Sequence, residues 1–96
     1  MPKAYLISAY HSVSDPDKFA AYRNLAGPAI VAAGGRYVAR GPAARAMEAG
    51  VLAQTVVVEF DDLVTALAVY DTPAYQEALR ALDGGAVRDM RIVEEI

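Results

Sequence analysis

Two kinds of β-strand pattern occur along this chain. Residues 3–13 and 54–60 are apolar at both odd and even positions, as in Tyr5-Leu6-Ile7 and Val56-Val57-Val58. Residues 36–40 and 88–95 instead mix apolar and polar side chains. Because side chains alternate between the two faces of a strand, an apolar run at both parities is typical of a strand covered on both sides. We therefore predict four strands, with residues 3–13 in the centre of the sheet.

A first helix is predicted between the first two strands. Asp15 is a suitable N-cap and Pro16 suits the first helical position, where its missing N–H costs nothing. Gly27-Pro28 lies in the middle of the stretch and predicts a kink or a break, because proline removes a helical hydrogen bond. Gly34-Gly35 ends the helix. An apolar stripe runs along it: Phe19, Tyr22, Ala26, Ala29 and Ala33.

A second helical stretch repeats this arrangement in the other half of the chain. We expect Asp61 to cap it, Asp71-Thr72-Pro73 to break and restart it, and Gly84-Gly85 to end it. The element order is then β-α-β-β-α-β. This order is typical of the ferredoxin-like fold, an α+β arrangement with a four-stranded antiparallel sheet and both helices on one face. We expect one such domain over residues 1–96.

The predicted fold leaves the second face of the sheet uncovered by helices. That face should be polar in a monomer, yet the strands at residues 3–13 and 54–60 are apolar on both faces. A second copy of the chain is the simplest cover for it. We therefore predict a homodimer in which the two sheets face each other.

Composition restricts the classes of function. The net charge is −3 with no basic cluster, which argues against a nucleic-acid partner. No apolar run approaches the roughly 20 residues of a membrane helix, so we expect no membrane association and a cytoplasmic location. There is no cysteine and only one histidine, which argues against a metal site; Asp61-Asp62 is better explained as a helix N-terminus. No cofactor motif is present, since Gly34-Gly35 does not lead from a strand into a helix.

Candidate chemistry rests on few side chains. His11 could act as a base near neutral pH, or it could be an exposed strand-end residue. Arg36 and Arg40 fall on one face of their strand in a simple alternation and could hold an anionic ligand. The alternative is structural pairing, because an antiparallel hairpin would bring Arg36 near Glu59.

Tyrosines form the other candidate group. Five of them could line an aromatic pocket or could simply pack in the core: Tyr10, Tyr22, Tyr37, Tyr70 and Tyr75. Of these, Tyr22 and Tyr70 are predicted to line a cleft between helices and sheet. His11 or Tyr70 would handle a proton if the cleft catalyses a reaction.

Several segments resemble a small domain-of-unknown-function family, DUF 1330, within the dimeric α+β barrel superfamily. Gly34-Gly35-Arg36-Tyr37 with Ala39-Arg40-Gly41 is the most distinctive of them. The others are residues 4–7, Asp15-Pro16 with Phe19 and Tyr22, Glu48 with Gly50, residues 56–60, residues 70–75 and Val93-Glu94. Val69 and Glu95 depart from the family pattern. The resemblance implies the fold and the dimer, but no settled activity.

Two functions remain open from the sequence. The first is a small-molecule protein that binds or transforms a small organic acid or aromatic molecule in the cleft, without a cofactor. It would use His11, Tyr70, Arg36, Arg40, Glu59 and Tyr22. Superfamily relatives that include cofactor-independent oxygenases and isomerases favour it by analogy of fold alone. The second is a non-catalytic dimeric accessory or stress-related interaction module. An enclosed pocket with converging polar groups favours the first, and a dry, packed cleft favours the second.

Overall fold

The computed structural model describes residues 2–96, and Met1 lies outside the described residues. Its elements follow the predicted order, with the second helical stretch divided in two. They are β1 (Ala4–Val13), α1 (Pro16–Ala32), β2 (Arg36–Pro42), β3 (Gln54–Phe60), α2 (Leu63–Val69), α3 (Pro73–Leu82) and β4 (Ala86–Glu94). All neighbouring strands are antiparallel, in the order β2-β3-β1-β4. The fold is ferredoxin-like, as predicted, and β1 is an inner strand of the sheet.

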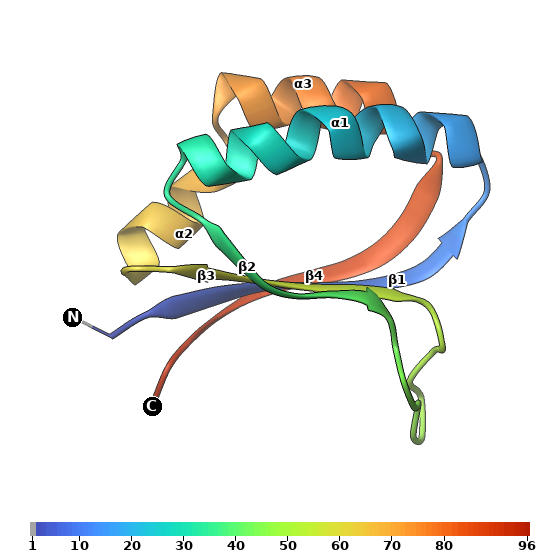
Figure 1. The fold of residues 1–96 in the computed structure, drawn as a ribbon, viewed down its shortest axis with the longest axis horizontal. Helices are drawn as coiled ribbons and strands as arrows, with labels where there is room; N and C mark the ends of the chain where they lie inside the picture. Colours follow the sequence, from blue (N-terminus) through green and yellow to red (C-terminus); the bar gives the residue numbers. More distant parts are fainter. Residues whose placement is uncertain (1) are drawn as a thin grey trace.

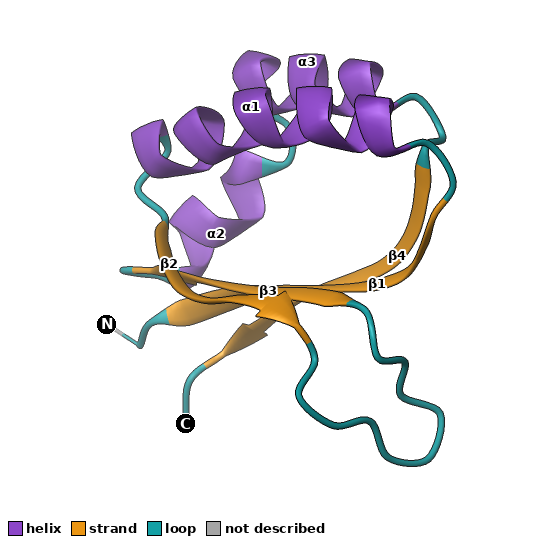
Figure 2. Ribbon diagram, turned by 45° about the vertical axis from the view of Figure 1, so that its right-hand side comes forward, coloured by secondary structure: helices purple, strands orange, loops and turns teal. Residues whose placement is uncertain are grey.

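The helices lie on one face of the sheet (Figure 1). Figure 2 shows α1 and α3 side by side above the sheet, with α2 leading from the end of β3 into this layer. We call this the covered face of the sheet, and the opposite one the open face. No helix among residues 2–96 has the length and apolar character needed to cross a membrane. The cytoplasmic location stays a prediction.

Local sequence signals explain most helix boundaries. The Asp15 side chain accepts hydrogen bonds from the backbone N–H groups of Asp17 and Lys18. Thr72 caps α3 just before Pro73, so the predicted break and restart are confirmed. The cap of α2 is Asp62 and not Asp61, because Asp62 accepts from the N–H of Thr65 while Asp61 pairs with Arg36.

The expected break at Gly27-Pro28 does not occur. Helix α1 runs without interruption from Pro16 to Ala32, with Pro28 inside it. Both Pro28 and Asn24 are exposed, so water can satisfy the Asn24 carbonyl that loses its helical partner. The helix ends where predicted: Gly34 has a φ of 100°, a conformation that favours glycine. A Cβ on Gly35 would lie 2.6 Å from Cγ2 of Ile30 and 2.8 Å from Cγ1 of Val58, so this position needs glycine for close packing.

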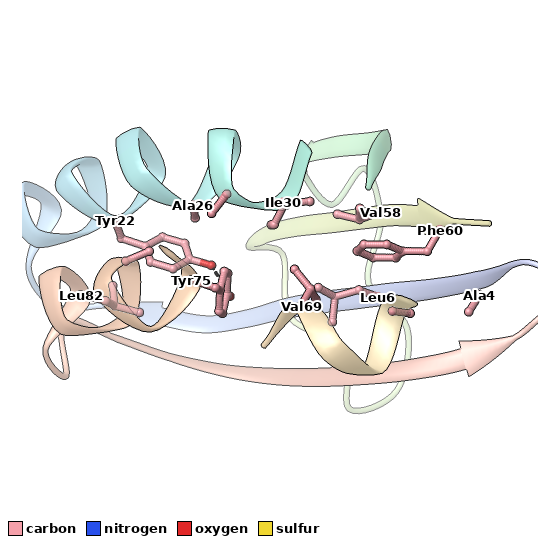
Figure 3. Close-up of a cluster of buried hydrophobic side chains, with 13 residues drawn as sticks. Ala4, Leu6, Tyr22, Ala26, Ile30, Val58, Phe60, Val69, Tyr75 and Leu82 are labelled. Atoms are coloured by element: carbon pink, nitrogen blue, oxygen red, sulfur yellow. Dashed lines mark hydrogen bonds between the residues drawn. The ribbon is translucent and has the colours of Figure 1, made fainter. Parts of the chain in front are cut away.

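The core lies between the helices and the covered face (Figure 3). Its largest fully buried side chains are Tyr75, Phe60, Val58 and Val69. From β1, the even-numbered positions 4, 6, 8 and 10 are buried there, whereas positions 5, 7 and 9 on the open face are only half-buried. The helices therefore account for the apolar character of one face of β1 but not of the other.

Candidate ligand-binding site

A cavity of about 310 Å³ lies between α1 and the covered face of the sheet. This volume is at the lower end of the range for small-molecule sites. Residues from all four strands, α1 and α3 contribute to its wall: Leu6, Ser8, Tyr10, Phe19, Tyr22, Arg23, Asn24, Ala26, Gly27, Ile30, Tyr37, Arg40, Gln54, Val56, Val58, Tyr75, Arg88 and Met90. The cleft predicted between helices and sheet is thus present and not closed by packing.

Arg88 is the centre of a hydrogen-bonded cluster in this wall. Its Nη1 donates to the hydroxyls of Tyr10 at 3.1 Å and Tyr22 at 2.8 Å, and its Nη2 donates to Tyr75 at 3.4 Å. The Tyr22 and Tyr75 hydroxyls are 2.5 Å apart and share a hydrogen bond (Figure 3). The guanidinium carbon also lies 4.5 Å from the centre of the Tyr22 ring, within cation–π distance.

Four different elements bring this cluster together. Tyr10 on β1 pairs directly with Arg88 on β4. Tyr22 comes from α1 and Tyr75 from α3, each on the buried side of its helix. Burial raises the pKa of the Tyr10, Tyr22 and Tyr75 hydroxyls above the ordinary value of about 10. All three phenols are therefore neutral at physiological pH and can act as hydrogen-bond donors.

Ser8 adds a buried polar group to the floor of the cavity. It is 5% exposed, and its hydroxyl has no hydrogen-bond partner within the described chain. A buried hydroxyl without a partner is costly, and such groups are rare in folded proteins. Ser8 is therefore available to a molecule that occupies the cavity.

All the charged side chains that line the cavity are positive. Three arginines line it, Arg23, Arg40 and Arg88, and no Asp or Glu is among its lining residues. Within residues 2–96, none of these three forms a salt bridge, while Lys3, Lys18, Arg36 and Arg91 all do. This concentration of unpaired positive charge occurs in a chain whose net charge is −3.

Arg40 reaches the cavity because of a β-bulge. Tyr37 pairs with Val58, and the next pair on β3 joins Ala39 to Val57, so Val38 is an extra residue in β2. Arg40 consequently pairs with Val56 on the covered face, and its guanidinium carbon lies 4.7 Å from the centre of the Tyr37 ring. The prediction that Arg36 and Arg40 share one face is wrong, because simple alternation fails at the bulge.

Arg36 lies on the open face in an ion-paired group. Its Nε and Nη2 donate to Oε1 of Glu59 at 3.2 and 2.9 Å, and Nη2 also donates to Asp61 at 2.9 Å. The Tyr5 hydroxyl donates to Glu59 as well, at 3.2 Å. The hydrogen bond from Arg36 holds the pKa of Glu59 below its ordinary value. The predicted cross-strand pair of Arg36 with Glu59 is confirmed, and neither residue lines the cavity.

The remaining predicted residues are spread over different sites. Tyr22 lines the cavity as expected. His11 is exposed near the end of β1, outside the cavity wall. Tyr70 is 43% exposed and belongs to a second, more open hollow of about 580 Å³ between α2 and β4. His11 and Tyr70 are therefore not brought together with the arginine cluster, although Arg88 borders both hollows.

Arg88 and Ser8 were missed as site residues at the level of sequence. A usable signal exists for Arg88, because it shares a parity with Met90 and Ile92 and so faces the core side of its strand. A charged residue at a strand position that faces the core is a candidate functional residue.

Residues 2–96 contain no group of three or more His, Asp or Glu side chains positioned to hold a metal ion.

These features define a class, the ferredoxin-like α+β domains, here with a ligand-sized cavity beneath the first helix. Within that class, the family model DUF1330, described as a domain of unknown function, matches residues 3–96. The chain belongs to the DUF1330 family. No curated protein matches it.

Solved structures with the same fold are distant in sequence. A protein of unknown function from Rhodopseudomonas palustris is 19% identical, with a TM-score of 0.69 over 98% of this chain and 81% of that one. A dimeric ferredoxin-like protein of unknown function from Thermobifida fusca is 20% identical, with a TM-score of 0.62 over 98% and 90% of the two chains. SnoaB, a cofactor-independent oxygenase from Streptomyces nogalater, is 11% identical, with a TM-score of 0.64 over 100% and 95%. At these identities the likeness shows the fold alone.

Proposed function

We propose that this protein binds a small organic acid with an aromatic or apolar body in the cavity beneath α1, without a cofactor. The observation that carries the proposal is the lining of the cavity by three arginines and no carboxylate. Arg88 is half-buried and bonded to neutral tyrosines in place of a counter-ion. A bound carboxylate would supply the missing negative charge, and hydrogen bonds to ionised groups are the stronger ones.

The number of free hydrogen-bond donors in the cavity wall also favours an organic acid as the ligand. Arg88 has five N–H donors, of which three reach tyrosine oxygens. The Tyr10 hydroxyl accepts from Arg88, and within residues 2–96 its own proton has no acceptor. The Ser8 hydroxyl has no partner either. The wall therefore has an excess of donors, which suits a ligand that brings acceptor oxygens.

The apolar part of the wall suits the body of such a ligand. Leu6 and Val58 face the cavity from the sheet, and Ile30 faces it from α1. Apolar walls with a few polar groups are usual for small-molecule sites.

Of the residues predicted from the sequence, this proposal retains Tyr22 and Arg40 and does not use Arg36 or Glu59. Cavity and converging polar groups together weigh against the alternative of a purely structural interaction module.

The test compares benzoate with benzamide, which has nearly the same shape and no charge. Calorimetric titration should show benzoate binding at least about tenfold more tightly, since one charge-assisted contact separates them. Arg88→Met should weaken benzoate binding to the level of benzamide, whereas Arg80→Met, an exposed arginine on α3, should leave it unchanged. Equal binding of benzoate and benzamide, or undiminished benzoate binding by a folded Arg88→Met protein, would refute the proposal.

We also propose that two copies of the chain associate through the open faces of their sheets. Ile7 and Val57 pair on that face and are only half-buried in the single chain, and Val93 is 51% exposed beside them. A second copy would bury this apolar surface. Dimeric relatives of the same fold support the proposal by analogy. Sedimentation should give twice the chain mass at micromolar concentration, and Ile7→Asp should shift it toward one chain; a wild-type mass of one chain would be decisive against it.

Whether the protein also catalyses a reaction is a separate proposal. It would use Tyr70 for proton transfer in the second hollow, which Arg88 also borders, with the oxygenase SnoaB as an analogy of fold only. His11, the other residue predicted for this role, lies outside the walls of both hollows. Once a ligand that is turned over is known, Tyr70→Phe should abolish turnover and spare binding, whereas His11→Asn should leave turnover unchanged. Unchanged turnover in Tyr70→Phe would remove Tyr70 from the mechanism.

A further inference from the structure

We infer that the ligand is a dianion with two separate acid groups, held at one end by Arg88 and at the other by Arg40. This inference rests on the proposed binding of an organic acid and narrows its class to dicarboxylates. It follows from where the two arginines lie, from the charge balance of the cavity and from the group that lies between them.

The two arginines belong to opposite edges of the sheet. Arg40 is on β2 and Arg88 on β4, and the strand order is β2-β3-β1-β4. At ~4.8 Å between neighbouring strands, the two strands that carry them are roughly 14 Å apart. Each guanidinium also has its own aromatic partners: Arg40 lies against the Tyr37 ring, and Arg88 is bonded to Tyr10 of β1 and Tyr22 of α1. A single acid group that contacted both would have to draw them away from these partners.

The charge of the cavity exceeds what one carboxylate neutralises. The chain has nine lysines and arginines; within residues 2–96, four of them form salt bridges, and three of the other five line this one cavity. Arg88 is the half-buried member, whereas Arg40 and Arg23 are exposed. A first acid group at Arg88 would leave Arg40 and Arg23 without negative charge. A second acid group near the exposed arginines would balance them.

The row of residues next to Arg40 suits an apolar body whose acid group also reaches a polar contact. Arg40, Val56, Ser8 and Met90 form one row across the sheet, because Val56 pairs with both Arg40 and Ser8, and Ser8 pairs with Met90. Val56 and Met90 offer apolar surface along this row. Ser8 is 5% exposed and its hydroxyl has no partner within residues 2–96, so it can donate to an acid group that reaches it.

The experiment measures the affinity of dicarboxylates against monoamides of the same shape. Terephthalate is paired with 4-carbamoylbenzoate, and naphthalene-2,6-dicarboxylate with its monoamide, so that two lengths are sampled. Wild-type protein should bind at least one diacid about tenfold or more tightly than its monoamide, as expected for one added charge-assisted contact. Arg40→Gln should remove this preference, because it weakens binding of the diacid by more than it weakens binding of the monoamide. Arg45→Gln, in the loop after β2 and outside the cavity wall, is the matched control.

Failure of the inference can be distinguished from failure of the proposed function. If diacid and monoamide bind equally and both depend on Arg88, the organic-acid proposal stands and the dianion inference is wrong. If the preference survives Arg40→Gln and is lost in Arg23→Gln, the assignment of Arg40 is wrong. Displacement of the diacid by inorganic phosphate at equal concentration would indicate one shared anion site and would also overturn the inference. Absence of binding by every acid would remove both proposals.

Discussion

The two faces of the sheet use arginine in opposite ways. On the open face, Arg36 lies 2.9 Å from both Glu59 and Asp61, and Arg91 pairs with Asp89 at 3.0 Å. On the covered face, Arg88 and Arg40 lie against tyrosine rings and, within residues 2–96, form no salt bridge. The positive charges of the open face are thus neutralised within the chain, and those of the covered face are not.

This difference separates a structural role from a binding role. An arginine paired with carboxylates at the surface contributes at most about 1 kcal/mol and has no unmet electrostatic need. A half-buried arginine without a counter-ion costs free energy of folding, because it is withdrawn from water without full compensation. A protein that keeps such a group forgoes stability, which is typical of functional sites.

The two faces should differ most in how far the loss of an apolar side chain lowers the free energy of unfolding. Leu6 on the covered face is 5% exposed, and its neighbour Ile7 on the open face is half-buried. Leu6→Ala should lower the free energy of unfolding by about 2–5 kcal/mol at any protein concentration. Ile7→Ala should cost less at submicromolar concentration, and its cost should grow as the protein is concentrated, because a second copy then covers this face. Urea unfolding at two protein concentrations measures both changes.

Equal and concentration-independent costs for the two substitutions would contradict the comparison. Such a result would mean that the chain alone covers both faces equally. A cost for Ile7→Ala that falls with protein concentration would count against the face-to-face dimer in particular.

A smaller difference is expected in the dependence of stability on pH. Burial raises the pKa of Tyr22 on the covered face, so in alkali the unfolded chain loses this proton before the folded chain does. Its contribution is therefore complete below about pH 10 and decreases as pH rises further. Arg36 lowers the pKa of Glu59 on the open face, so the contribution of Glu59 is complete above about pH 4.3 and is lost as pH falls through its folded value.

Two variants test whether Tyr22 on the covered face causes the loss of stability in alkali and whether Glu59 on the open face causes the loss in acid. Tyr22→Phe should reduce the loss of stability above pH 10 and leave the acid side unchanged. Glu59→Gln should reduce the loss below about pH 4.3 and largely spare the alkaline side. Urea midpoints measured across the pH range provide the readout, and a Tyr22→Phe protein with the wild-type alkaline loss would show that Tyr22 is not the cause.

Much of the fold could be predicted from short-range signals. Asp15-Pro16 and Thr72-Pro73 begin helices, and Gly34-Gly35 ends one, because each depends on the backbone preferences of one or two residues. The apolar residues at both odd and even positions of residues 3–13 correctly predicted that β1 is an inner strand of the sheet. Pro28 misled the prediction, because a proline on the exposed side of a helix can be accommodated without a break.

The site was less predictable, because it depends on register and on distant contacts. Nothing at Val38 marks a bulge in the sequence, yet this one extra residue moves Arg40 to the covered face. Tyr10, Tyr22 and Tyr75 converge on Arg88 from separate elements, which no periodicity reveals. Only the parity of Arg88 with Met90 and Ile92 offered a sequence signal.

The smallest expected effect concerns Gly27, which lines the cavity from α1. A Cβ there would meet no atom within 4 Å, and Gly27 has an ordinary helical conformation. Gly27→Ala should therefore raise the free energy of unfolding by roughly 0.5–1 kcal/mol, because alanine is the better helix former. Gly84→Ala is the matched control: its Cβ would also meet open space, but its φ of 71° disfavours alanine and should reverse the sign. If thermal unfolding shows Gly27→Ala to be stabilising while benzoate binding weakens, the covered face gives up stability to keep its cavity open. A variant that gains stability with unchanged or tighter binding would show that Gly27 does not limit the space available to the ligand.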